Sequence, residues 1–296
     1  NQAALERSLT TLTFFIIIIN ITNLFYFSIV IMYSIVIAIV ITNYAINDDV
    51  AFKNTANQNN ILGPAITFSH QGRMILLHGL DIYFLNKISQ DNFLLFYSFS
   101  GLTFLFCGIF LKNILPKNIS IGVYIWLVVL IGSLCTTSIF FRLMYQERYI
   151  LLAFLMLTYV LTKMKKGYVQ LFLSFLLCNF IIHSKEAGIA AMLCLGAGFI
   201  IKSIFRMKSI NKYNLALGMI PTLSSIIAII YYLINIFPNI EHRYGENNTS
   251  YFSYIPFNLG KWIVNEPFIF LLFAPLFLYR VYEIVKKKQD IHIYDI

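Results

Sequence analysis

Three pairs of charged residues stand at the ends of long apolar runs in this chain: Asp48 with Asp49, Glu147 with Arg148, and Lys185 with Glu186. A carboxylate in such a place can accept a proton from an attacking hydroxyl group. An ammonium or guanidinium group can hold the oxygens of a phosphate. Acting together, groups of these two kinds suit the transfer of a chemical group from a phosphate-bearing donor.

Each pair also has a purely structural explanation. Asp48 and Asp49 are good helix caps, so they fit a solvated turn at the end of a helix. Two adjacent carboxylates also repel each other unless they share a proton or a divalent cation, so a metal at this pair is a further alternative. Each of the other two pairs joins a cation to an anion, and such neighbours can neutralise each other locally. The sequence leaves these explanations open.

The composition of the chain indicates a membrane protein. Of its 296 residues, 59% are hydrophobic and 12% are charged, and the mean hydropathy is +0.74. A soluble domain has about 25% charged residues. The apolar residues fall into runs of about 15 to 25, a length that crosses a hydrocarbon core about 30 Å thick. Because the runs lack the period-two alternation of barrel strands, the predicted fold is an all-α, polytopic bundle of transmembrane helices.

We predict about eight spans within a single transmembrane domain, residues 1–296. They are expected at about residues 22–45, 92–111, 119–139, 144–162, 168–182, 186–201, 215–237 and 263–285. The first outer loop, about 46–91, is long and is expected to carry an amphipathic helix at 74–85. The fourth outer loop covers about 238–262. A tight turn near 183–188 separates two short spans, because one continuous helix would place three polar side chains near the bilayer midplane: His183, Lys185 and Glu186.

Lysine and arginine residues assign the two sides of the membrane. One set of loops, with both termini, holds 14 of the 22 basic residues and 4 acidic ones; the other set holds 8 and 9, so the net charges are +10 and −1. The positive-inside rule places the first set, with both termini, in the cytoplasm. This topology accounts for the net charge of +9, so nucleic acid is not expected as a partner. All three charged pairs then fall on the outer face.

The order of the motifs resembles the GT-C superfamily of membrane glycosyltransferases, which use polyprenyl-phosphate sugars. The resemblance covers about residues 22–201 and consists of four short motifs on one side of the membrane: Asp48-Asp49, Gly72-Arg73, Glu147-Arg148-Tyr149 and Ser184-Lys185-Glu186. The superfamily includes protein O-mannosyltransferases, the aminoarabinose transferases of lipid A and the O-antigen glucosyltransferases of bacteria; the first two motifs look most like the last group. Members are commonly longer, so a C-terminal part beyond Ile296 is expected to be missing.

The resemblance implies an inverting transfer of a sugar to an acceptor hydroxyl on the outer face of a bacterial inner membrane. The acceptor would be a glycan, a lipid or a protein. Asp48, in preference to Asp49, would be the general base. The other implied roles are Lys185 with Arg148 or Arg73 on the leaving phosphate, Glu147, Glu186 and His183 orienting these cations, and His242, Arg243 and Tyr244 in a loop over the acceptor.

Two other classes of protein share these features. A transporter or flippase would also be all-helical, but it usually shows internal repeats and mid-span breaks. Pro221 and Pro275 are the main mid-span candidates, and no repeat is visible in the sequence. A non-catalytic membrane partner in lipid-linked glycan assembly would bind similar ligands without cleaving a sugar phosphate. Turnover of a polyprenyl-phosphate sugar without a nucleotide sugar distinguishes the enzyme from both.

Overall fold

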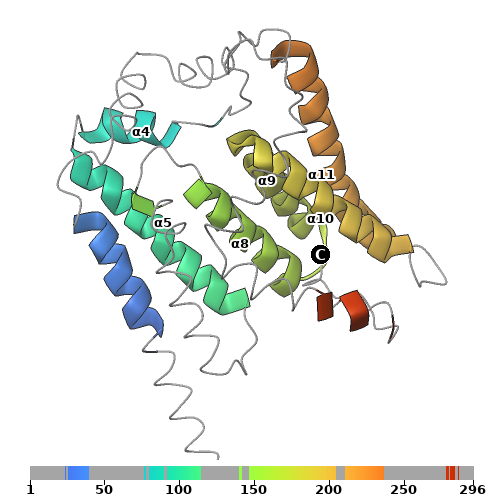
Figure 1. Ribbon diagram of the computed structural model, residues 1–296, viewed down its shortest axis with the longest axis horizontal. Helices are drawn as coiled ribbons and strands as arrows, with labels where there is room; N and C mark the ends of the chain where they lie inside the picture. The colour runs from blue at the N-terminus through green and yellow to red at the C-terminus, as the bar shows by residue number, and fades with distance from the viewer. Residues whose placement is uncertain are drawn as a thin grey trace, which may run out of the picture.

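Figure 1 shows the computed structural model, which describes residues 24, 26–39, 77, 80–89, 92–114, 140–141, 147–204, 211–236, 278–279, 281–283 and 286. The labelled elements are α4 (Leu80–Ser89), α5 (Phe93–Ile114), α8 (Glu147–Lys163), α9 (Tyr168–Ser184), α10 (Glu186–Ile204), α11 (Lys212–Tyr231) and the π-helical turn η1 (Tyr232–Ile236). A further helix, Tyr26–Ile39, precedes them. Within these residues every regular element is helical, which confirms the predicted all-α fold for this part of the chain.

Several helices have the length and composition of membrane spans. Three are long and apolar enough to cross a bilayer: Leu94–Ile114, Glu186–Ile204 and Lys212–Ile236. Two more are apolar but shorter: Tyr26–Ile39 and Tyr168–Ser184. Many large apolar side chains on these helices are exposed, which suits a surface covered by lipid rather than by water. These features support an integral membrane protein.

The number of eight spans stays a prediction, because the predicted spans at 119–139 and 263–285 lie largely outside the described residues. The helices that are described reverse direction along the chain. Gln170, near the start of α9, donates from Nε2 to the carbonyl oxygen of Val160, near the end of α8, at 2.7 Å. Tyr213, at the start of α11, also bonds to Gln170, so α9 and α11 begin at the same end of the bundle.

The predicted tight turn between α9 and α10 is confirmed. α9 ends at Ser184, Lys185 has extended backbone with φ −164° and ψ 151°, and α10 begins at Glu186. Gly188 then lets the start of α10 lie against the end of α9, because a Cβ at this position would be 2.2 Å from the carbonyl oxygen of Ile181. The two helices therefore form a hairpin whose turn holds a single residue outside the helices.

α4 differs in its bounds from the amphipathic helix predicted at 74–85. It spans Leu80–Ser89 and so continues four residues past the predicted end. The prediction stopped where the apolar run stops, but the polar residues beyond Leu85 also adopt helical backbone. Asp81 and Leu85 lie one turn apart and share a face, and Leu85 is buried whereas Phe84 is exposed. α4 thus presents Asp81 toward the bundle.

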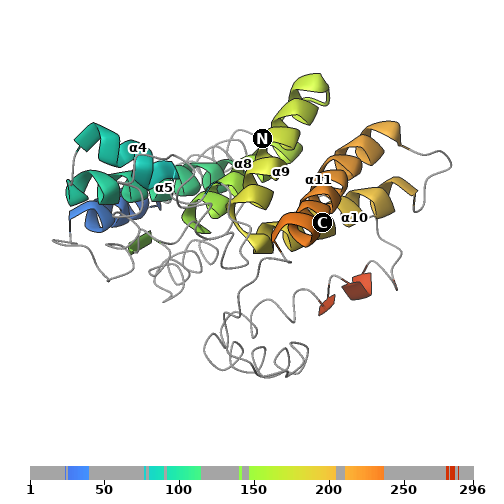
Figure 2. The same cartoon turned by 90° about the horizontal axis from the view of Figure 1, so that it is seen from above.

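The described helices pack in a row rather than around one centre. Figure 2 shows helix 26–39, α4 and α5 on one side, α8 and α9 in the middle, and α10 and α11 on the other side. One apolar cluster joins helix 26–39 to α5 and includes Phe104 and Phe140, whose rings lie 5.0 Å apart. A second cluster joins α8, α9, α10 and α11 and includes Leu157 and Ile181.

Glycines set the close packing of α10 on α11. A Cβ at Gly196 would lie 2.1 Å from Thr222 Oγ1 and 2.8 Å from the carbonyl oxygen of Gly218. A Cβ at Gly218 would lie 2.9 Å from the carbonyl oxygen of Gly196. Small residues that allow backbones to approach are a common basis of helix association in membranes, where the hydrophobic effect does not drive helices together.

We expect Gly196→Ala to destabilise the protein, because the added methyl group forces α10 away from α11. Overpacking of this kind costs about 1–3 kcal/mol. Gly167→Ala is the matched control, since a Cβ at Gly167 meets nothing within 4 Å and its φ of 165° is extended. Thermal unfolding in detergent should show a lower midpoint for the first variant alone. Equal midpoints for the two variants would contradict the glycine contact.

Candidate functional site

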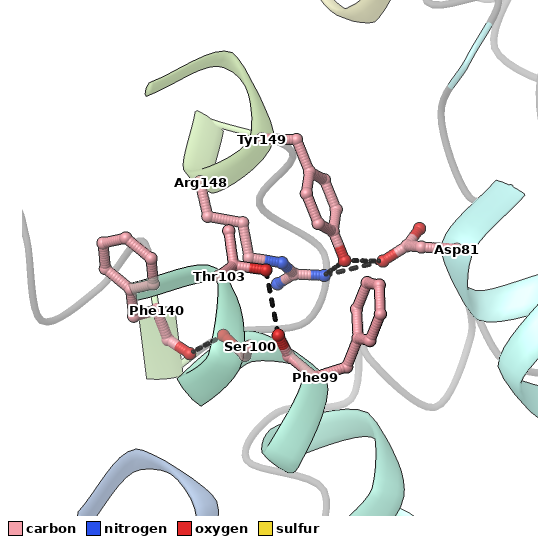
Figure 3. A network of polar contacts seen from close by, with 7 residues as sticks. All are labelled: Asp81, Phe99, Ser100, Thr103, Phe140, Arg148 and Tyr149. Carbon is pink, nitrogen blue, oxygen red and sulfur yellow. Dashed lines mark hydrogen bonds and ion pairs between the residues drawn. The ribbon is translucent and has the colours of Figure 1, made fainter. Parts of the chain in front are cut away.

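Arg148, in the first turn of α8, is buried although it carries a charge: 1% of its side chain is exposed. Its Nη2 atom donates to Asp81 Oδ2 at 2.8 Å. Asp81 belongs to α4, 67 residues earlier in the chain, and is 11% exposed. A charge taken out of water is costly unless a group of opposite charge compensates it. The ion pair therefore fixes α4 against the start of α8 (Figure 3).

Tyr149 completes the contact between Arg148 and Asp81. Its hydroxyl donates to Asp81 Oδ2 at 2.7 Å and accepts from Arg148 Nη2 at 3.2 Å. The guanidinium carbon lies 4.6 Å from the centroid of the Tyr149 ring, within the range of a cation–π contact. The same ring lies 6.3 Å from that of Phe99 in α5. α4, α5 and α8 thus meet at one cluster, the Asp81–Arg148–Tyr149 network (Figure 3).

A second ion pair lies beside this network. Lys185, in the turn between α9 and α10, bonds through Nζ to Oε1 of Glu147. Glu147 directly precedes Arg148, so the two ion pairs are neighbours at the start of α8. In the Lys185–Glu147 pair 29% of each side chain is exposed, in contrast to 1% for Arg148. The ammonium group of Lys185 is therefore more accessible to a ligand than the guanidinium group of Arg148.

Both ion pairs join different helices instead of neighbours in the sequence. Arg148 bonds to Asp81 rather than to Glu147, and Lys185 bonds to Glu147 rather than to Glu186. The local pairing that the sequence allowed is thus replaced by contacts from α4 to α8 and from α8 to the hairpin. These contacts gather residues 81, 147–149 and 183–186 at one end of the bundle, which we call the hairpin end.

Two more of the predicted site residues lie at the hairpin end. His183, half-buried in the last turn of α9, accepts through its carbonyl oxygen from the amide of Leu77 at 3.1 Å. Its Nδ1 atom is buried and makes no hydrogen bond within the described residues. Glu186 is half-buried in the first turn of α10 and forms no ion pair with any residue that the structure describes. Within the described residues, therefore, neither His183 Nδ1 nor the Glu186 carboxylate is held by an ion pair or a hydrogen bond.

The remaining predicted site residues lie outside the described part of the chain: Asp48, Asp49, Arg73, His242, Arg243 and Tyr244. The predicted general base and the predicted acceptor loop therefore stay predictions. Among the described residues, no three His, Cys, Asp or Glu side chains gather as a metal site would require. The two aspartates that would hold a divalent cation are not among those residues.

Asp81 and Tyr149 are members of the network whose roles the sequence did not predict. Asp81 is the one acidic residue between positions 50 and 90. An isolated carboxylate in a predicted amphipathic helix is a signal that it pairs with a cation elsewhere in the chain. Tyr149 belongs to a motif already singled out, but its hydroxyl gave no reason to select it. A single sequence contains no information that pairs residue 81 with residue 148.

Removing the carboxylate of Asp81 is expected to destabilise the fold strongly. Asp81→Ala takes the counter-charge from a buried guanidinium group, which costs about 3–5 kcal/mol. Glu147→Ala disrupts a partly exposed pair, for which about 0–1 kcal/mol is expected. Asp81→Ala combined with Arg148→Met should recover much of the loss. Thermal unfolding of the three variants in detergent measures this order; equal stabilities of the two single variants would contradict it.

Comparison with protein-family models, with curated proteins and with solved structures gives no match to this chain. Its resemblance to glycosyltransferases therefore depends on the short motifs in the sequence.

Proposed function

We propose that this protein is a membrane glycosyltransferase of the GT-C type, which transfers a sugar from a polyprenyl-phosphate donor to an acceptor hydroxyl with inversion. The observation that carries the proposal is the partly exposed ammonium group of Lys185, held by Glu147 at the hairpin end. The transfer takes place on the outer face of a bacterial inner membrane. The acceptor is a glycan, a lipid or a protein.

The position of Lys185 suits the leaving phosphate of such a donor. Lys185 directly precedes the first turn of α10, where the helix dipole and the unpaired backbone amides favour an anion. Cleavage of the sugar–phosphate bond leaves negative charge on the lipid phosphate, and a cation held in place stabilises that charge as it develops. Glu147 orients the ammonium group but leaves part of it exposed. A lipid-linked donor reaches this end from within the bilayer.

Arg148 takes a positioning role in this mechanism, because its side chain is buried and bonded to Asp81. It holds the start of α8, and with it Glu147, in the place from which Glu147 meets Lys185. Arg73 is the second candidate for direct contact with the phosphate. His183 and Glu186 supply additional polar atoms at the same end.

The acceptor hydroxyl is activated by an aspartate of the first outer loop. Asp48 is the preferred general base and Asp49 its alternative, with a divalent cation at the pair as a further possible role. The base removes the proton of the hydroxyl group as its oxygen attacks the anomeric carbon on the face opposite the phosphate, which inverts the configuration there. His242, Arg243 and Tyr244 belong to the loop that covers the acceptor.

The transporter alternative would be favoured by an unwound segment in the middle of a span. Pro221 was the main candidate for such a break among the described helices. It is buried inside α11, and α11 runs without interruption from Lys212 to Tyr231. The π-helical turn η1 lies at the end of this helix, not at its middle.

Lys185→Ala is expected to weaken binding of a polyprenyl phosphate and to leave acceptor binding unchanged. The loss of one charge-assisted contact, about 1.5–3 kcal/mol, corresponds to roughly tenfold to a hundredfold in affinity. Lys163→Ala, which removes a lysine at the other end of α8, is the matched control. A short-chain polyprenyl phosphate, titrated against the purified protein in detergent, measures the affinity.

The double variant Lys185→Ala with Glu147→Ala distinguishes a phosphate-binding role of Lys185 from a purely structural ion pair with Glu147. If Lys185 binds phosphate, the double variant folds but binds the donor as poorly as Lys185→Ala. If Lys185 serves only to neutralise Glu147, the double variant regains both stability and donor binding. That second result would refute the phosphate role.

Asp48→Asn and Asp49→Asn, made separately, test the general base. Asparagine keeps the size and much of the hydrogen bonding of aspartate but does not accept the proton, so one variant should lose about two to four orders of magnitude in rate. Folding and donor binding should persist in both. Transfer from a labelled polyprenyl-phosphate sugar is the measurement. A pair that only caps a helix tolerates asparagine, so near wild-type rates in both variants would exclude the catalytic role. If the lost activity is recovered at high metal concentration, the pair binds a cation.

A further inference from the structure

Two polar side chains meet between α9 and α11 within the length of the span. Asn179 of α9 donates from Nδ2 to Oγ of Ser224 in α11 at 3.2 Å, and both residues are half-buried. Asn179 stands six positions before Lys185 and eleven after Tyr168. At 1.5 Å per helical residue it therefore lies about 9 Å from the first and about 16 Å from the second along the helix. We call Asn179 and Ser224 the polar couple.

The polar couple keeps one hydrogen-bond acceptor and one donor unused. The amide nitrogen of Asn179 spends its two N–H groups on Ser224 Oγ and on the carbonyl oxygen of Phe175, which lies at 2.8 Å. Among the residues that the structure describes, no group donates to Asn179 Oδ1 and none accepts from the Ser224 hydroxyl. The nearby hydroxyls of Thr222 and Ser225, by contrast, both donate to backbone carbonyl oxygens.

Exposed apolar side chains surround the polar couple. Phe175 and Leu176, one turn before Asn179 on α9, are each 46% exposed, and Ile227, one turn after Ser224 on α11, is 66% exposed. Such a surface suits the hydrocarbon region, where no water is present to bond to polar groups. An amide oxygen and a hydroxyl proton without partners are costly there. A partner that brings both a donor and an acceptor to this depth is therefore favoured.

The arrangement of the polar couple points to a second copy of the chain as this partner. Its unused donor and its unused acceptor lie side by side on one surface, since Asn179 and Ser224 are directly bonded. A two-fold axis beside the couple brings the Ser224 hydroxyl of each copy to Asn179 Oδ1 of the other, so all four unused groups are satisfied. A lipid tail offers neither group, and a lipid ester offers acceptors alone. Hydrogen bonds of this kind between helices contribute to association in membranes.

We propose that the surface of α9 and α11 around the polar couple is the interface of a homodimer within the bilayer, in which Ser224 of each copy donates to Asn179 of the other. The exposed apolar side chains beside the couple pack across the two-fold axis. With this axis along the membrane normal, the two copies have the same orientation and their couples meet at the same depth. The inference does not depend on the proposed sugar transfer.

Energy transfer between two differently labelled samples of the purified chain tests the dimer in phosphatidylcholine vesicles. Transfer should rise and saturate with the protein-to-lipid ratio, as a monomer–dimer equilibrium requires. Asn179→Leu and Ser224→Ala should each raise the ratio at half-saturation about tenfold, because two symmetry-related hydrogen bonds are lost. Transfer no greater than that of randomly distributed monomers would overturn the proposal.

Two further variants show whether the effect belongs to the polar couple. Thr158→Val removes a half-buried hydroxyl of α8 that donates to a carbonyl oxygen of its own helix, so it should leave association unchanged. Ser224→Thr keeps the hydroxyl and should retain wild-type association. Equal shifts for Thr158→Val and Ser224→Ala would contradict the interface. Unchanged association in Asn179→Leu and Ser224→Ala would contradict it too, and would indicate that another part of the same chain covers the couple.

Cross-linking keeps the test decisive if Asn179→Leu and Ser224→Ala impair folding. Two differently tagged chains, one with Asn179→Cys and the other with Ser224→Cys, are produced together with their native cysteines replaced by alanine, and are oxidised in the membrane. A disulfide that joins the two tags is expected. Folded chains that give no such product would refute the two-fold arrangement, as would an equal yield with Thr158→Cys in place of Ser224→Cys. Circular dichroism and size-exclusion chromatography verify folding in each case.

Discussion

A guanidinium group buried at the start of α8 is the constraint on which the hairpin end depends. With 1% of its side chain exposed, Arg148 requires a carboxylate. Its neighbour Glu147 does not supply one, because that side chain bonds to Lys185. The carboxylate comes instead from Asp81, so the ion pair that compensates the charge of Arg148 also holds α4 against the bundle. Glu147 is thereby left to pair with Lys185, whose side chain is 29% exposed.

The two ends of the bundle differ in how their charged side chains are arranged. At the hairpin end cations and anions are paired across helices, so the proposed donor phosphate would meet a cation, Lys185, whose orientation Glu147 already fixes. At the opposite end, where α8 and α10 end and α9 and α11 begin, a cavity is lined by Lys166 and Lys202 and has no carboxylate among its lining residues.

Features of the fold that depend on local composition can be predicted from the sequence alone. Apolar runs located the described helices, and the cost of placing His183, Lys185 and Glu186 at the midplane was enough to predict the hairpin. The last turn of α4 was missed, because hydrophobicity ends at Leu85 although the helical backbone continues. The pairing of charges could not be predicted either. In the sequence Arg148 follows Glu147 and Lys185 precedes Glu186, so a local ion pair was available to each cation. The packing of α4 and the hairpin on α8 instead pairs Arg148 with Asp81 and Lys185 with Glu147.

The lengths of α9 and α10 connect the two ends to the two membrane surfaces. Lys166 and Lys185 are 19 positions apart on α9 and its flanking turns, which at 1.5 Å per helical residue separates them by about 28 Å. A tilt of about 20° reduces the span along the membrane normal to about 27 Å, a little less than a hydrocarbon core of about 30 Å. With Lys166 at one headgroup layer, Lys185 lies just inside the other, and its flexible side chain covers the difference. The lengths of these two helices therefore suit the proposed function, in which Lys185 would meet the phosphate of a lipid-linked donor near one membrane surface.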